Sequence, residues 1–317
     1  MQQDTSNRYL TSLGAGLSKT GVAALSVGSN LTLTLLKLVI GLFTGSVSVI
    51  AEAIHSGVDL LASVIAYFAV RTSARPPDDD HPYGHGKIEN ISGTIEALLI
   101  FLAAGLIVNE AVGRLLSDAP APHVDLGLVA MGVSVVANTV VSRMLFNVAR
   151  RTDSVALEAD AYHLTTDIAT SVGVFVGLVV VKITGFAFLD PIIALFVAGL
   201  IVKAAWDITR KSFVDLLDRS LPDDERAVIE SVLNEHADLV VGFHRVRTRK
   251  AGADRHIDLH LVVNGEQSVA AAHDLCDHLE RDLYQAIGSC TVTIHVEPCR
   301  QNCGRCDVKC RERQPVA

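Results

Sequence analysis

The chain is organised around residues 51–59, AEAIHSGVD, which lie inside an apolar segment long enough to cross a membrane. His55 and Asp59 are four residues apart, so in a helix their side chains share one face. Ionisable side chains are costly in hydrocarbon, and they therefore face a protein interior or a water-filled path. The pattern predicts that His55 and Asp59 belong to a functional site within the membrane.

A near-copy of this stretch stands downstream at residues 160–167, DAYHLTTD. It again has an acid, an alanine and a His-x-x-x-Asp pair, here His163 and Asp167, beside a long apolar run. Two such helices face to face would offer two imidazoles and two carboxylates, the ligand set of a tetrahedral zinc site. We predict that the chain is built around this four-residue site.

The composition favours a membrane protein. Of the 317 residues, 50% are hydrophobic, and the mean hydropathy of +0.37 is high for a soluble chain. The length permits two domains. The formal net charge of -8 argues against nucleic acid as a partner. Residues 1–19 are interpreted as a polar lead-in, because no basic-apolar-small pattern of a signal peptide opens the chain.

Six apolar segments are each near the ~20 residues that span a bilayer, and we expect six transmembrane helices. They cover residues 22–43, 47–70, 91–113, 125–147, 158–182 and 189–207. Lys and Arg gather at alternate ends of these segments, so the positive-inside rule predicts that both termini lie in the cytoplasm. A soluble all-helical protein with six buried helices is the less favoured alternative. With this topology the two His-x-x-x-Asp motifs run antiparallel, as in two halves of inverted topology that bind a ligand near the midplane.

The loop after the second segment, at residues 78–89, has the sequence DDDHPYGHGKIE. It carries carboxylates and imidazoles within eight residues, and His81 and His85 are spaced by four. A solvated acidic turn and a second metal site both account for this composition.

Taken together, these motifs resemble the cation diffusion facilitator family, of the bacterial zinc/proton antiporter type, over about residues 17–298. The motifs that carry the resemblance are His-x-x-x-Asp in the second and fifth segments and Asp-x-x-His-Pro-Tyr-Gly-His-Gly-Lys-x-Glu between the second and third. The resemblance implies a homodimeric exporter of divalent metal ions driven by protons, not an enzyme, in a bacterial inner or plasma membrane.

Residue by residue, the resemblance implies three features in the membrane half. The transport site matches His55, Asp59, His163 and Asp167. A second, loop-borne metal site matches Asp78, His81 and His85. An inter-helical charge pair that helps to hold the dimer near the membrane surface matches Lys87 and Asp218.

After residue 210 the composition becomes mixed and polar. A helix is predicted from about residue 221 to 236, strands at 240–249 and 255–263, an amphipathic helix at 268–287 and a last strand at 291–296. The order αββαβ predicts a small α+β, ferredoxin-like domain with helices on one face of the sheet. We therefore expect a transport domain at 1–210, a cytoplasmic regulatory and dimerisation domain at 211–298 and a Cys-rich tail at 299–317.

Alternation in the second strand puts His256, Asp258 and His260 on one face, opposite three apolar residues. The family resemblance implies a two-metal site in this domain, with the ligands His244, His260, His273, His295 and Glu297. Relatives often carry Asp at the position of Glu297, so this chain departs there from the usual bridging ligand of the family.

Four cysteines crowd into the tail, which the family pattern does not cover. They are Cys299, Cys303, Cys306 and Cys310. On the cytoplasmic side their thiols can hold one zinc or a softer ion such as Cu(I), and a disordered tail is the alternative. Cys276 and Cys290 are interpreted as packed cysteines.

The leading hypothesis is a secondary transporter that exports Zn²⁺ in exchange for protons across a lipid membrane. Metal binding requires neutral His and ionised Asp, so it releases protons. With Zn²⁺ bound, two carboxylates and two neutral His give a net charge of zero. The empty site with two carboxylates and two protonated His also has a net charge of zero. One alternative is an exporter of the same family that prefers another metal (Co²⁺, Cd²⁺ or Fe²⁺), and another is a membrane-anchored metal sensor. A third is an intramembrane metallohydrolase, but the four ligands and the lack of a further general base argue against it.

Overall fold

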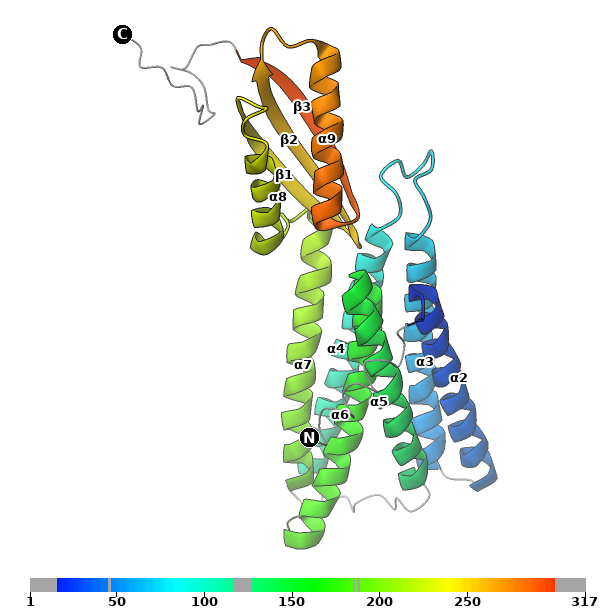
Figure 1. Ribbon diagram of the computed structural model, residues 1–317. Helices are drawn as coiled ribbons and strands as arrows, with labels where there is room; N and C mark the ends of the chain where they lie inside the picture. The colour runs from blue at the N-terminus through cyan, green and yellow to red at the C-terminus, as the bar shows by residue number, and fades with distance from the viewer. Residues whose placement is uncertain (1–15, 45–46, 117–126, 185, 187–188, 300–317) are drawn as a thin grey trace, which may run out of the picture. The chain divides into compact units, whose positions relative to one another are not determined.

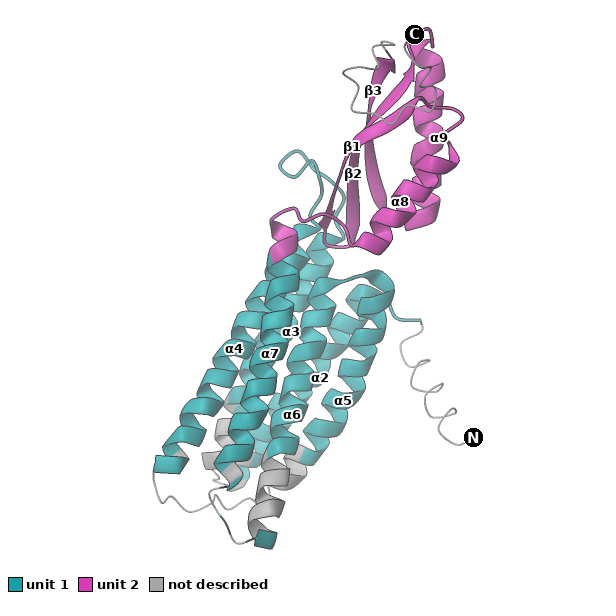
Figure 2. Cartoon of the chain, turned by 90° about the vertical axis from the view of Figure 1, so that its left-hand side faces the viewer, with its two compact units in different colours: residues 1–213 teal, residues 214–317 magenta. Residues whose placement is uncertain are grey.

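A computed structural model describes residues 16–44, 47–116, 127–184, 186 and 189–299. The chain divides into two compact units, residues 1–213 and 214–317, shown in different colours in Figure 2. The first unit is helical and the second combines helices with a sheet, so the expected fold class, a helical membrane domain followed by a small αββαβ domain, is confirmed.

Long helices that run alternately up and down make up the described part of the first unit (Figure 1). They are α2 (Lys19–Thr44), α3 (Val47–Ser73), α4 (Lys87–Leu116), α5 (Gly127–Thr152), α6 (Val155–Thr184) and α7 (Leu189–Leu216). Each of the six apolar segments marked in the sequence falls on one of them. Within the described residues, four stretches are long and apolar enough to cross a membrane: Lys19–Ile40, Lys87–Gly113, Gly132–Thr152 and Pro191–Leu216.

Small side chains fill the interior of this unit, and large apolar ones point outward. Ala97 and Ala104 of α4 are fully buried against α6 and α7. On the same helix Leu98, Leu102 and Leu106 are 58%, 59% and 60% exposed at four-residue spacing, which makes an apolar outer stripe. Alanine allows helices to approach closely, while hydrocarbon tolerates exposed leucine, so this arrangement is that of a membrane bundle.

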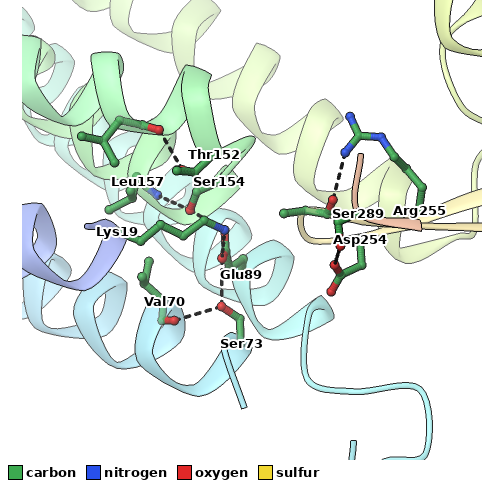
Figure 3. A network of polar contacts seen from close by, with 12 residues as sticks. Lys19, Val70, Ser73, Glu89, Thr152, Ser154, Leu157, Asp254, Arg255 and Ser289 are labelled. Carbon is green, nitrogen blue, oxygen red and sulfur yellow. Dashed lines mark hydrogen bonds and ion pairs between the residues drawn. The ribbon is translucent and has the colours of Figure 1, made fainter. Parts of the chain in front are cut away.

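One buried carboxylate joins four helix ends on the side of the bundle where residues 74–86 connect α3 to α4 (Figure 3). Glu89, in the first turn of α4, is 1% exposed. It pairs with Lys19 at the start of α2 at 3.3 Å and accepts a hydrogen bond from Ser73 at the end of α3 at 2.8 Å. Ser154, just before α6, donates a further hydrogen bond to it. This carboxylate therefore fixes the helix ends next to the loop.

The second unit consists of α8 (Asp223–Glu235), β1 (Gly242–Ala251), β2 (Asp254–Asn264), α9 (Val269–Ile287) and β3 (Cys290–Cys299). β2 is the central strand, antiparallel to β1 and parallel to β3. Figure 2 shows both helices on the same side of the sheet. Alternate residues of β2, among them Ile257, Leu259 and Leu261, pack with α8 and α9 in one apolar core. The other residues of each strand therefore point away from the helices.

Candidate metal sites

The two His-x-x-x-Asp motifs meet inside the helical unit. α3 supplies His55 and Asp59, and α6 supplies His163 and Asp167. The His163 Nε2 atom lies 3.2 Å from an Asp59 carboxylate oxygen, and both side chains are buried. One ligand atom from each of His55, Asp59 and Asp167 lies within 4.8 Å of the others. The structure thus brings the four residues expected from sequence to one place.

A polar stripe of α2 supports α3 beside this cluster. The Asn30 side chain donates to the backbone oxygen of Asp59 at 3.5 Å. One turn further, the Thr34 hydroxyl donates to the backbone oxygen of Ser56 at 2.9 Å. Lys37 donates to the Ser56 hydroxyl at 2.8 Å. These contacts fix the rotation of α3 and so help to aim Asp59 at α6.

Sequence reasoning missed two buried ionisable residues near the cluster, Lys37 and Glu96, and gave no role to a third, Asp160, which stands in the repeated motif. Lys37 is 7% exposed and lies within electrostatic range of Asp167. Glu96 and Asp160 are fully buried, and each interacts electrostatically with His163. Each is an ionisable residue within or beside an apolar segment, which is the signal that should have singled them out.

In the loop, Asp78 lies between two histidines. Its carboxylate oxygens are 3.2 Å from His81 Nδ1 and 3.3 Å from His85 Nε2, and the two rings are 4.5 Å apart. The backbone N–H of His81 donates to the Asp78 carboxylate at 2.7 Å and lowers the pKa of that carboxyl. The three side chains, with His85 buried, form a group that can hold a metal ion.

On the open face of the sheet three histidines stand side by side. His260 of β2 is in register with His244 of β1 and with His295 of β3. Glu297 lies 3.1 Å from His244, 2.8 Å from His260 and 3.8 Å from His295. The hydrogen bond with His260 lowers the pKa of the Glu297 carboxyl, and that with His244 adds to the effect. His244, His260 and Glu297 therefore form a group that can hold a metal ion.

His273, expected in the same site, lies apart from this row within the chain. It belongs to α9, on the helix-bearing side of the sheet, where its side chain is 72% exposed and lies 3.8 Å from Asp277. His244, His260 and Glu297 point to the opposite side of the sheet, so the His273 side chain does not reach them within the same chain. His273 was assigned from the family resemblance alone, because strand alternation gives no position for a residue of a helix.

The remaining expected residues fall in different places. Lys87 starts α4 in the first unit, whereas Asp218 lies in the second, 3.6 Å from Arg249, so their pairing stays a prediction. Cys299 ends β3, and the other tail cysteines lie outside the described residues. Cys276 is a buried thiol of the α8–α9 core, and burial raises the pKa values of Cys276 and Cys290.

Comparison with known proteins covers almost the whole chain. Residues 23–217 match the model of the cation efflux transmembrane domain, and residues 221–299 match that of the cation efflux protein cytoplasmic domain. An uncharacterized transporter of Synechocystis is 37% identical over 87% of this chain and 89% of its own length. The cation-efflux pump FieF of Shewanella oneidensis is 33% identical over 86% and 92%. The solved zinc form of CzrB is 43% identical over 26% of this chain and 92% of its own, with a TM-score of 0.25.

The transmembrane match spans more than half of the chain, and it includes both His-x-x-x-Asp motifs and the loop between α3 and α4. The match to the cytoplasmic domain covers the sheet with its row of histidines. The chain therefore belongs to the cation efflux family of membrane transporters, the cation diffusion facilitators.

Proposed function

We propose that this transporter exports Zn²⁺ from the cytoplasm in exchange for protons, and that His55, Asp59, His163 and Asp167 form its transport site. The observation that carries the proposal is the contact between α3 and α6. There two buried side chains, Asp59 and His163, approach to 3.2 Å in the interior of a membrane bundle. Two antiparallel helices that share one ligand cluster can expose it alternately to the two sides.

The ligand set favours zinc. Bonds of ~2.0–2.1 Å in a tetrahedron separate neighbouring ligand atoms by about 3.3 Å, close to the distance between His163 and Asp59. Two imidazoles and two carboxylates suit Zn²⁺, whereas Mg²⁺ and Ca²⁺ prefer more oxygen ligands. Co²⁺ is the expected second substrate, because it accepts the same ligands and geometry. Cd²⁺, Fe²⁺ and Mn²⁺ are expected to be carried less well.

Proton exchange follows from competition for the same atoms. A metal ion binds the imidazole nitrogen and the carboxylate oxygen in their deprotonated forms, so loading the site releases protons and protonation releases the metal. Asp59 and His163 lie 3.2 Å apart, so either a proton or a metal ion can occupy the space between them. A higher proton concentration outside the cell then drives unloading on that side.

Two further groups, in the loop and on the open face of the sheet, are assigned supporting roles. Asp78, His81 and His85 stand on the loop next to the helix ends that Glu89 joins, and we assign them to metal capture from the cytoplasm. The cluster at Glu297 belongs to a domain whose family model is that of the cytoplasmic domain, and we assign it to metal-dependent regulation of a homodimer. Both termini are then cytoplasmic, as the distribution of Lys and Arg predicts.

The test is metal flux in proteoliposomes that contain the purified full-length chain and a dye for internal pH. An imposed pH gradient is expected to drive Zn²⁺ against its own gradient. At equal free ion concentration, Zn²⁺ is expected to move faster than Co²⁺, and Co²⁺ faster than Cd²⁺. Zn²⁺ transport that ignores the pH gradient would contradict the exchange, and faster Cd²⁺ or Fe²⁺ transport would contradict the assignment of zinc.

A further inference from the structure

Two histidines and an aspartate meet where the end of α8 lies against α9. His236 follows the last residue of α8, while His278 and Asp282 are one turn apart on α9. The same carboxylate oxygen, Asp282 Oδ2, is 3.0 Å from His236 Nε2 and 3.6 Å from His278 Nε2. The two imidazole rings are 4.9 Å apart. This cluster lies on the helix side of the sheet, away from Glu297, and is a separate group.

The distances are those of ligands around one small ion. Metal–ligand bonds of ~2.0–2.1 Å in a tetrahedron put neighbouring ligand atoms about 3.3 Å apart. The two separations from Asp282 Oδ2, 3.0 Å and 3.6 Å, fall on either side of that value. One ligand atom from each residue lies within 4.8 Å of the others, so a single ion can contact all three.

The fold also orients the first histidine for this role. His236 Nδ1 lies 2.9 Å from the backbone oxygen of Val232, four residues earlier in α8. With Nδ1 donating to that oxygen, the lone pair of Nε2 points toward Asp282. A backbone carbonyl that holds the second ring nitrogen is the usual support of a metal-binding histidine.

We propose that His236, His278 and Asp282 form a further Zn²⁺ site of the cytoplasmic domain, which links the end of α8 to α9. The side chains of His236, Asp282 and His278 are 13%, 32% and 47% exposed, so one side of the site is open to water. Three protein ligands with a water in the fourth position give a site that exchanges metal with the solvent. The assignment does not depend on the transport mechanism, because these residues belong to the second unit alone.

A rival account needs no metal. A protonated His236 at the end of α8 would pair with Asp282 and would also interact favourably with the helix dipole. Both accounts use the contact between His236 and Asp282, but only the zinc site needs His278 as a ligand. Removing the His278 imidazole therefore separates them.

The experiment measures zinc bound per chain by the full-length protein in detergent. Metal is first removed with chelator, the protein is dialysed against buffered free Zn²⁺, and bound zinc is counted by mass spectrometry. The variants are Asp282→Asn and His278→Gln. The matched control, Asp274→Asn, makes the same change as Asp282→Asn at an exposed position two turns earlier on α9.

Both variants are expected to bind one zinc fewer per chain, or to need at least tenfold more free zinc for that step, while the control matches the unaltered protein. Circular dichroism in chelator checks that each variant is folded; His278 is half exposed, so its loss does not disturb the core. Binding curves of His278→Gln that coincide with those of the unaltered protein over the whole range would overturn the site. Loss of the same zinc in the control would overturn it as well.

Discussion

The carboxylate of Glu89 offers a test of how the helix ends are held. Replacing it by Gln keeps the shape of the side chain and removes its charge. The carboxylate has contacts with Lys19, Ser73 and Ser154, and it is 1% exposed. A hydrogen bond to a charged group contributes about 1–1.5 kcal/mol more than a neutral one. Three such contacts amount to about 3–4.5 kcal/mol, near the cost of breaking a buried ion pair.

The chain also provides the matched control. Glu158 occupies the first turn of α6 as Glu89 occupies that of α4, and it pairs with Lys211. Both partners of that pair are partly exposed, so Glu158→Gln should cost under about 1 kcal/mol. For a unit of this size, each kcal/mol shifts the melting temperature by roughly 2–4 °C.

The assay heats the purified protein in detergent to a series of temperatures. Size-exclusion chromatography then measures the fraction that remains folded at each temperature. Glu89→Gln is expected to melt roughly 6–18 °C below the unaltered chain, and Glu158→Gln within a few degrees of it. The reasoning fails if Glu89→Gln melts with the unaltered protein, or if both variants fall by the same amount.

Three further predictions follow from single residues. His55→Asp should relax the choice of zinc and raise Cd²⁺ flux relative to Zn²⁺ in proteoliposomes, since it replaces a nitrogen ligand by oxygen; an unchanged ratio would contradict the role of this position. Lys37→Gln should weaken zinc binding roughly fivefold in equilibrium dialysis, because it removes the hydrogen bond to the Ser56 hydroxyl that helps to fix the rotation of α3, a loss of about 1 kcal/mol; unchanged or tighter binding would contradict this supporting role. Burial, aided by the charge of Arg249, lowers the pKa of His256 in the folded state. The contribution of His256 to the stability of the second unit is therefore complete above about pH 6.5 and is lost as the pH falls through the lower folded pKa. His256→Gln should abolish that fall in thermal melts between pH 7.5 and 5.5, and an identical slope in both proteins would refute the assignment.

Hydropathy located the membrane helices but not their ends. The segment expected to end at residue 207 continues as α7 to Leu216, and the one expected to start at residue 91 starts at Lys87. Apolar composition marks the part of a helix that lies in lipid, whereas backbone hydrogen bonds continue into water. The ends are instead set by capping and by contacts such as those of Glu89, which only the tertiary structure shows.

The residues of the candidate metal sites were predictable from sequence where their spacing is local. A separation of four put His55 beside Asp59, and strand alternation put His260 and His295 on the open face. The α2 residues that support Asp59 were not predictable in this way, because a contact between helices depends on their rotation. His236 was missed for the same reason, although the His278–Asp282 spacing on one helix was a visible signal.

The central claim is that metal and protons compete for one site formed by α3 and α6. The most direct measurement records Zn²⁺ flux and proton counterflow together in proteoliposomes, for the unaltered chain, for Asp59→Asn, and for the control Asp207→Asn at an exposed position of α7. We predict opposite movement of zinc and protons in the unaltered chain and the control, and neither in Asp59→Asn. A folded Asp59→Asn protein that carries both at the rate of the unaltered chain would contradict the account.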